Sequence, residues 1–258
     1  MPKPEADSHI DISAPDAVSY GHLKVRPSEK RQRVQSHFDV IARRYDLAYV
    51  LLSFGLYRWW RRSCLEALKL SAGDRLLDLC GGTGDLSRMA ACRRSAHSVV
   101  CDLNRAMMQA GRRKMSGVNH LQWVHGNAEW LPFSEGAFDS VFVGLGLRNL
   151  AYVEKGLEEI FRVLNPGGRL VILEFSIPFA PTMKTIYLTY SFKIMPALGG
   201  LVTGAQAPFR YLAESVHDFP KPEYVGDTLH KTGFTDVAFK PLSKGLVTLY
   251  TARKPGFD

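Results

Sequence analysis

Short apolar runs alternate with longer amphipathic stretches along most of the chain. The apolar runs predict five buried strands. The first begins at Leu76, and the other four cover 97–102, 121–125, 138–144 and 169–175. One helical stretch, 153–164, stops at an Asn-Pro-Gly-Gly sequence, which is a strong terminator. Strands that alternate with helices predict an α/β fold with a mostly parallel, doubly wound sheet.

An apolar segment follows the fifth predicted strand and covers 176–222. It is too long for a connecting loop. We expect it to form helices over the crevice at the carboxyl ends of the strands, where such sheets bind ligands. Helices within 34–70 should complete this lid, and two last strands are expected at 236–240 and 246–252.

A glycine-rich turn follows the first strand. Gly81, Gly82 and Gly84 let the backbone approach a ligand closely, because glycine has no Cβ. The amides of the following helix favour polar or carboxylate-bearing ligands. The third glycine of the NAD fingerprint would fall at Ser87, so the loop favours S-adenosylmethionine over NAD. A purely structural turn is the third interpretation.

Two later strands end in polar residues that suit a nucleoside. Asp102 lies 18 positions after Gly84, where a carboxylate can accept hydrogen bonds from both ribose hydroxyls. Its alternative role is to cap the helix from Arg105 onward, for which Asn104 competes. Asn127, before a small residue, can reach an adenine edge, although a simple turn also explains it.

Several longer motifs resemble one enzyme family, the C-methyltransferases of ubiquinone and menaquinone biosynthesis (UbiE type). The resemblance runs from about Val34 to Tyr250. Its glycine loop and Asn-Pro-Gly-Gly turn are widespread, whereas Gly-Leu-Arg-Asn and the Tyr-Ser-Phe-Lys segment are close to family-specific. The motifs are Leu77-Asp-Leu-Cys-Gly-Gly-Thr-Gly-Asp-Leu86, Asn127-Ala-Glu-Trp-Leu-Pro-Phe133, Gly146-Leu-Arg-Asn149, Arg162-Val-Leu-Asn-Pro-Gly-Gly168, Leu173-Glu-Phe-Ser176, Tyr190-Ser-Phe-Lys193 and Tyr211-Leu-Ala-Glu-Ser215.

The resemblance implies a class I methyltransferase fold, with a Rossmann-like sheet of seven strands and an antiparallel last strand. It also implies S-adenosylmethionine as the methyl donor and a prenylated hydroquinone as the acceptor. With the glycine loop and the two nucleoside residues, the predicted cofactor-binding residues are Asp78, Gly81, Gly82, Thr83, Gly84, Asp102, Leu103, Asn127, Ala128 and Leu145.

The sequence departs from the family pattern on the acceptor side. Ala48-Tyr49 replaces a family Met-Asn, Gly204-Ala205 replaces Gly-Asp, Phe209 replaces a frequent Tyr, and Lys244-Gly245 replaces a glycine pair. These changes keep a second enzymatic interpretation open: a paralogue that methylates another hydrophobic aromatic or lipid, or that uses S-adenosylmethionine for non-methyl chemistry. A non-catalytic binding protein fits the donor loop poorly.

Carbon methylation of a hydroquinone needs a phenolate, and a phenol ionises in water near a pKa of about 10. Arg148 stays protonated and is the predicted electrostatic stabiliser, although a salt bridge at a helix start is its alternative role. Asn149 is expected to orient a hydroxyl or a water. Asp46, His217 and Tyr187 are the candidate proton acceptors, with a surface histidine as the alternative for His217.

The 258 residues suit one domain, and the formal net charge is +8. We expect a mobile tail over 1–30 and a methyltransferase domain over 31–258. Basic residues at 26–33 and 58–62, the latter beside tryptophans, suit an anionic membrane surface, RNA or a solvated helix face. An RNA base methyltransferase usually has an Asn/Asp-Pro-Pro-aromatic turn where this chain has Leu145-Gly-Leu-Arg148, so no nucleic-acid partner is expected.

Four cysteines without metal or redox spacing indicate reduced thiols, so no metal is expected. No stretch resembles a signal peptide or a membrane span. The predicted location is therefore the cytoplasm, with peripheral association with the inner membrane through a lipid quinol substrate. A homodimer is a further expectation.

Overall fold

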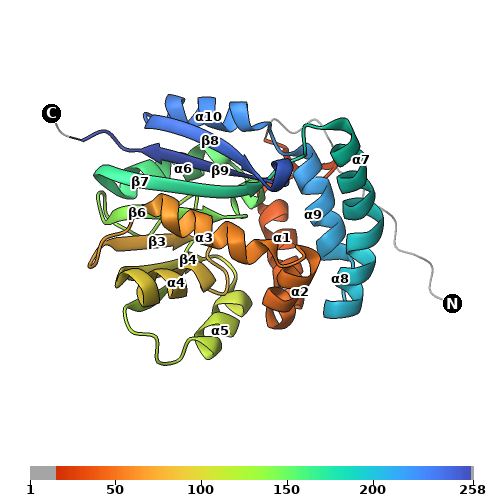
Figure 1. Ribbon diagram of the computed structural model, residues 1–258, viewed down its shortest axis with the longest axis horizontal. Coiled ribbons are helices and arrows are strands. Elements are labelled where there is room, and N and C mark those ends of the chain that lie inside the picture. Colours follow the sequence, from red (N-terminus) through yellow and green to blue (C-terminus); the bar gives the residue numbers. More distant parts are fainter. Residues whose placement is uncertain (1–15, 257–258) are drawn as a thin grey trace.

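A twisted sheet of seven strands forms the centre of the computed structural model, which describes residues 16–256 (Figure 1). All neighbours are parallel except around β9, which runs antiparallel to both β7 and β8. In spatial order the strands are β5 (Leu121–His125), β4 (His97–Asp102), β3 (Arg75–Leu79), β6 (Phe138–Gly144), β7 (Leu164–Phe175), β9 (Val247–Arg253) and β8 (Thr235–Leu242). The predicted fold class, with its antiparallel last strand, is confirmed.

The strand positions also follow the apolar pattern closely. The runs at 97–102, 121–125 and 138–144 match β4, β5 and β6 residue for residue. β7 begins five residues before the predicted 169, because the chain leaves the preceding helix at Val163 directly into extended backbone. The Asn-Pro-Gly-Gly sequence therefore lies in the first part of β7.

Helices cover both faces of the sheet. On one face, α3 (Leu56–Leu68) and α4 (Asp85–Arg94) share an apolar cluster with the sheet. On the other, α6 (Val153–Val163) and α10 (Pro222–Lys231) form a second cluster with β3, β6 and β7. α5 (Arg105–Lys114) follows β4. The four helices α3, α4, α6 and α10 each bury apolar side chains against the sheet, and the ligand sites of such sheets lie at the carboxyl ends of the strands.

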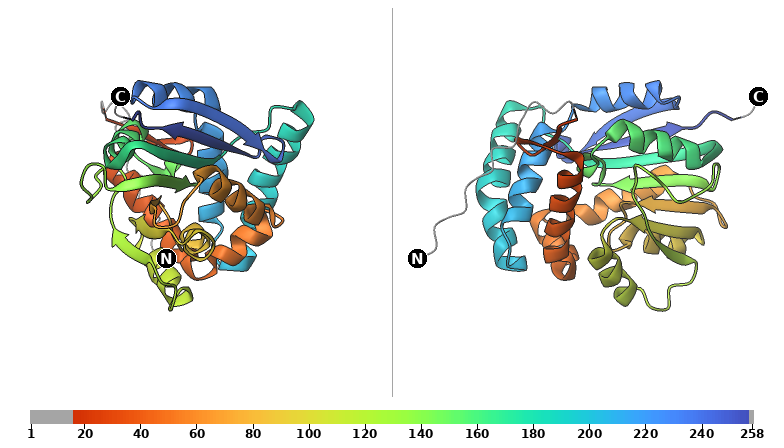
Figure 2. Two further views of the ribbon diagram at one scale, coloured as in Figure 1. Left: turned by 60° about the vertical axis from the view of Figure 1, so that its left-hand side comes forward. Right: turned by 180° about the vertical axis from the view of Figure 1, so that it is seen from behind.

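A separate group of helices stands at the carboxyl end of the parallel strands, away from the C-terminal residues (Figures 1 and 2). The group comprises α1 (Pro27–Ile41), α2 (Tyr45–Leu52), α7 (Pro181–Thr189), a π-helical turn (Tyr190–Ile194), α8 (Met195–Thr203) and α9 (Ala207–Asp218). α2 packs on α8, and α1 packs on α9. The two sequence segments expected to form a lid thus lie together, except that α3 packs against β7 as part of the sheet layers.

Residues 16–30 differ from the mobile tail that we predicted over 1–30. Within that range the chain forms a hairpin, β1 (Val18–Tyr20) and β2 (Leu23–Val25), and then the start of α1. Tyr20 and Val25 are buried against Tyr211 of α9, and this apolar contact holds the hairpin against that helix. The rest of the predicted tail lies outside the described residues. Between residues 16 and 256, no helix has the length and apolarity needed to cross a membrane.

Candidate active site

Nine of the ten predicted cofactor residues line two adjoining cavities at the carboxyl ends of β3, β4 and β6, and the tenth, Gly84, caps α4 in the same loop. The first, the nucleoside cavity, holds Gly82, Asp102, Leu103, Asn127, Ala128 and Leu145 in its wall. The second, the amino-acid cavity, holds Asp78, Gly81, Gly82 and Thr83. They share Tyr45, Cys80, Gly82 and Gly144, so one elongated ligand can occupy both.

The glycine loop needs its glycines for backbone reasons. Gly82 and Gly84 have φ of 56° and 73°, which side chains rarely adopt. A Cβ on Gly81 would lie 2.8 Å from both the Asp78 carbonyl oxygen and Val100 Cγ1. The loop therefore holds its amides close to the strand ends, where a nucleoside or an amino-acid group could contact them.

Asp102 orders this loop from the neighbouring strand. Its carboxylate accepts hydrogen bonds from the Gly82 amide at 2.8 Å and the Asn104 amide at 2.7 Å, which leaves lone pairs for a ligand. Burial raises the pKa of Asp102. The competing role of helix cap belongs to Asn104, whose Oδ1 accepts the Met107 amide at 2.8 Å. Asp102 therefore does not serve as the N-cap of α5.

The position of Asn127 is compatible with both roles considered from the sequence. Its Oδ1 accepts the Glu129 amide at 3.0 Å, which closes the simple turn considered from the sequence. The side-chain NH₂ keeps two donors, and the residue lines the nucleoside cavity. Glu129 in turn pairs with Arg31 of α1 at 2.7 Å, so the lid helix is tied to this turn.

The amino-acid cavity is lined by two acids, Asp78 and Asp85, and one cation, Arg61. Asp78 accepts the Ser87 amide and hydroxyl through Oδ2, at 3.2 and 2.8 Å, which leaves Oδ1 as an acceptor. Burial raises the pKa of Asp78 to about 7. Arg61 also lines this cavity, and its buried Nε has no hydrogen-bond partner among the described residues. An ammonium group beside Asp78 and a carboxylate beside Arg61 would satisfy both.

Arg61 is a residue that sequence reasoning missed. It belongs to the basic segment 58–62, which we interpreted as a membrane, RNA or solvent face. Instead its guanidinium stacks over Tyr57 at 4.4 Å and pairs with Asp85. The helical spacing of Tyr57 and Arg61 was the available signal, because residues four apart share a face.

A larger cavity of about 520 Å³ lies among α2, α7, the π-helical turn and α9. We call it the apolar cavity, because nearly all of its lining is aliphatic or aromatic, including Leu52, Phe54, Phe175, Ile186 and Leu212. Its volume is typical of sites for small organic ligands. The predicted proton acceptor Tyr187 lines it, but burial raises the pKa of Tyr187, so this phenol donates rather than accepts.

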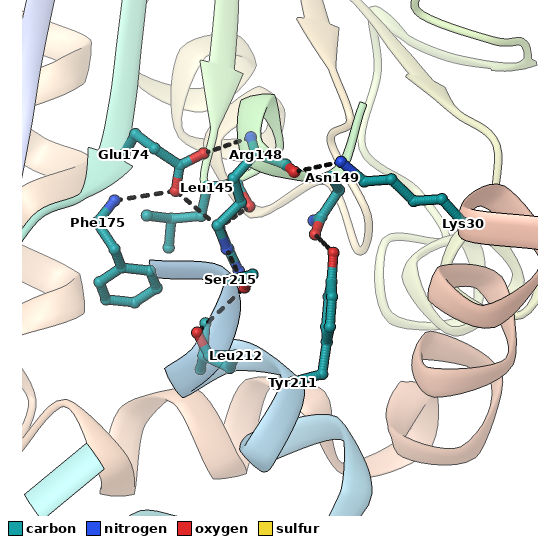
Figure 3. A network of polar contacts seen from close by, with 9 residues as sticks. All are labelled: Lys30, Leu145, Arg148, Asn149, Glu174, Phe175, Tyr211, Leu212 and Ser215. Atoms are coloured by element: carbon teal, nitrogen blue, oxygen red, sulfur yellow. Dashed lines mark hydrogen bonds and ion pairs between the residues drawn. The ribbon is translucent and has the colours of Figure 1, made fainter. Parts of the chain in front are cut away.

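Arg148 lies at the turn after β6, inside a network of polar contacts (Figure 3). It is buried and pairs with the buried Glu174 at 2.7 Å, while Nε contacts Ser215 at 3.3 Å. Burial alone would lower the pKa of Arg148, but Glu174 raises it above the ordinary value. Its guanidinium also lies 5.4 Å from the centre of the Phe175 ring, at the wall of the apolar cavity.

Asn149 follows in the same turn and accepts the Tyr211 hydroxyl at 3.1 Å (Figure 3). The turn is held from α1 by Lys30, whose ammonium donates to the carbonyls of Arg148 and Leu150 at 3.2 and 2.6 Å. Burial lowers the pKa of Lys30 to about 8. Asn149 lines the nucleoside cavity and Arg148 lies beside Phe175 of the apolar cavity, so this turn lies between the two cavities.

The other two candidate proton acceptors lie away from the apolar cavity. Asp46 accepts the Thr83 hydroxyl at 2.7 Å and pairs with Lys114, outside the donor loop. His217 is half-exposed, contacts Asp218 at 3.0 Å, and lines none of the cavities described above. The geometry thus favours a surface histidine at 217 and a loop-tethering role for Asp46.

A sequence model of the ubiE/COQ5 methyltransferase family matches residues 26–254. The chain belongs to this family. It is 37% identical over 255 residues to the ubiquinone/menaquinone biosynthesis C-methyltransferase UbiE of Haemophilus ducreyi, with 97% of this chain and 98% of that protein covered. It is 39% identical over 244 residues to the UbiE of Methylobacterium nodulans, with 92% and 97% covered.

Solved structures show the same fold at low sequence identity. The [4+2]-cyclase SpnF has a TM-score of 0.65 and 16% identity, with 88% of this chain and 96% of that chain covered. A phosphoethanolamine N-methyltransferase 2 of Haemonchus contortus, in complex with phosphomonomethylethanolamine and S-adenosylhomocysteine, has a TM-score of 0.61 and 16% identity, with 81% and 56% covered. The family member described here is an S-adenosylmethionine-dependent methyltransferase with the class I fold.

Proposed function

We propose that this methyltransferase transfers a methyl group from S-adenosylmethionine to a ring carbon of a prenylated hydroquinone, a precursor of ubiquinone or menaquinone. The observation that carries the proposal is the position of the apolar cavity. It has space for a prenyl tail and lies beside the turn of Arg148 and Asn149, which also borders the donor cavities. A hydrophobic aromatic acceptor is the ligand class that this arrangement fits.

The residues around the donor cavities fit the cofactor. Asp102 would accept the ribose hydroxyls, the Asn127 amide would contact the adenine edge, and Asp78 and Arg61 would hold the ammonium and carboxylate of the methionyl end. The orphaned Nε of Arg61 supports the last assignment. When bound, S-adenosylmethionine supplies an electrophilic methyl group on its sulfonium sulfur.

The chain's own residues supply orientation and electrostatics. Arg148 remains protonated and lies beside Phe175 of the cavity wall, from where it would stabilise a developing phenolate. Because Arg148 is paired with Glu174, the two charges largely cancel at a distance. The attraction between Arg148 and a phenolate would therefore act only over a short range inside the apolar site. Asn149 and the Tyr187 hydroxyl would orient the ring oxygens, and the aromatic walls would exclude water.

The mouth of the apolar cavity favours contact with an anionic membrane surface, from which a lipid quinol would enter. Phe54, Ile186 and Ile194 line the cavity and are also exposed, Phe54 by 77%. The same helices expose further apolar side chains, and the neighbouring exposed cations are Arg44, Arg58, Lys184 and Lys193. Each cation near such a surface adds about 1 kcal/mol of attraction.

Two experiments test these assignments. Methyl-labelled S-adenosylmethionine is incubated with the protein and a reduced membrane lipid extract, and the products are analysed by mass spectrometry. Label on a quinone ring carbon supports the proposed reaction, whereas label on another lipid, or none with cofactor binding intact, contradicts it. Size-exclusion chromatography with light scattering tests the expected homodimer.

The membrane contact is tested by sedimentation with phosphatidylglycerol-containing vesicles. Phe54→Asp should reduce the bound fraction several-fold, while Trp130→Asp should not, because Trp130 is also exposed but stacks under Lys155 away from the cavity mouth. Equal binding by Phe54→Asp and the wild type would contradict docking through this rim.

A further inference from the structure

A small cavity lies where the donor and acceptor sides approach each other. This cavity shares Phe38 and Tyr45 with the nucleoside cavity. It shares Tyr49 and Phe209 with the apolar cavity. An aromatic ring positioned between a methyl donor on one side and its own tail on the other must lie near this junction. His37 of α1 is the one histidine among the described residues that line it.

We propose that His37 is the proton acceptor for the hydroxyl of the quinol ring. This inference rests on the proposed function, and it assigns the base that none of Asp46, His217 and Tyr187 supplies in the structure. Nothing in the sequence singled out His37, because it lies in a polar stretch of the expected lid, far along the chain from Arg148.

The ring of His37 is held in place by aromatic neighbours. Its Nε2 lies within hydrogen-bond distance of the Tyr20 hydroxyl, and it stacks on Tyr211 with ring centres 5.3 Å apart. Tyr20 also stacks on Tyr211, at 4.6 Å, and the Tyr211 hydroxyl reaches Asn149. With Nε2 bonded to Tyr20, Nδ1 can act as the proton acceptor in the tautomer where Nε2 donates.

The surroundings keep this imidazole neutral at physiological pH. Burial lowers the pKa of His37, and the Arg33 guanidinium on the same helix lowers it further. Facing it from other elements are Tyr20, Tyr45, Tyr49, Tyr211 and Arg148, of which the four phenols have pKa values raised by burial. Phenols that stay protonated are not competing bases at neutral pH, and the Tyr20 oxygen can still accept the Nε2 proton of His37.

The reaction balances with His37 as a temporary carrier. The hydroxyl proton moves to His37, and the released electron pair raises the electron density of the ring. The ring carbon bonds to the methyl carbon as the methyl–sulfur bond breaks, and sulfur keeps that electron pair as a neutral thioether. The hydrogen on the methylated carbon then leaves to solvent as a proton, and the ring oxygen recovers its proton from His37. One proton is released in total.

The test compares His37→Gln and His37→Asn with the wild type and with His230→Gln, an exposed histidine at the end of α10. The probe is the quinol form of a menaquinone precursor that lacks the ring methyl and carries a short prenyl tail. Turnover is measured anaerobically across the acidic and neutral pH range, together with thermal unfolding and cofactor affinity for each variant.

A general base contributes typically about 100-fold or more to a rate. We expect the His37 variants to lose about 100-fold in kcat at neutral pH, with KM and cofactor affinity near those of the wild type. The wild-type rate should fall on the acid side as His37 becomes protonated, and this decline should be absent from His37→Gln. His230→Gln should retain both the rate and the profile.

Two results overturn different parts of the inference. If the wild type turns over the quinol and the His37 variants match His230→Gln in rate and pH profile, the assignment of His37 is wrong and the proposed reaction stands. If the wild type binds S-adenosylmethionine but methylates no quinol, the proposed function fails and the role of His37 fails with it.

Discussion

Replacement of Glu174 by leucine tests the buried ion pair at the centre of the site. Arg148 and Glu174 have side chains that are 3% and 1% exposed and meet at 2.7 Å, and Glu174 also accepts the amides of Arg148 and Phe175 at 3.2 and 2.9 Å. Removal of one partner from a buried pair typically costs about 3–5 kcal/mol, because the remaining charge has no compensation. Glu174→Leu should therefore lower the free energy of unfolding by about that amount.

The measurement is urea or thermal unfolding followed by circular dichroism. For a chain of this size, each kcal/mol corresponds to a change in Tm of about 2–4 °C, so a decrease of at least about 6 °C is expected. The matched control is Glu66→Leu, because Glu66 pairs with Arg62 at 3.2 Å on the surface, where such a pair contributes about 0.5 kcal/mol or less.

A double variant separates charge from packing. Arg148→Met combined with Glu174→Leu should recover most of the lost stability, because apolar residues of similar volume often replace a buried pair without cost. It should not recover turnover if Arg148 stabilises the phenolate. A free energy of unfolding for Glu174→Leu within about 1 kcal/mol of the wild type would refute the reasoning about the uncompensated charge.

Three further predictions concern the donor and acceptor cavities. Asp102→Ala should weaken S-adenosylmethionine at least about tenfold, since one hydrogen bond to a charged group contributes about 1.5–3 kcal/mol; calorimetric titration with an unchanged affinity would contradict the ribose assignment. Because the pKa of Asp78 is raised to about 7, a lower pH neutralises the carboxylate that would meet the cofactor's ammonium. Affinity should fall as pH decreases below about 7, and Asp78→Asn should remove that dependence. Leu212→Trp should fill part of the apolar cavity and raise KM for long-tailed quinols more than for short-tailed ones, in steady-state assays.

Secondary structure and the donor loop could be predicted because their signals are local. Alternating apolar runs and helices indicated the strands of the sheet, and the glycine spacing with Asp102 indicated the donor side. A strand end, a tight turn and a helix start depend on neighbouring residues, so a single sequence records them. The hairpin at 18–25 escaped prediction, because its stability comes from Tyr211, nearly two hundred positions away.

Which polar residues meet around the apolar cavity follows from the packing of distant segments. The apolar pattern and the motifs predicted the fold class, the family and nine residues that line the nucleoside and amino-acid cavities. They did not show that Arg148 is paired with Glu174, that Arg61 and Asp78 line one cavity, or that His37 lines a small cavity between the nucleoside and apolar cavities. The physical reason is that charge compensation, burial and the pKa of a side chain depend on packing between distant segments, which local patterns do not record.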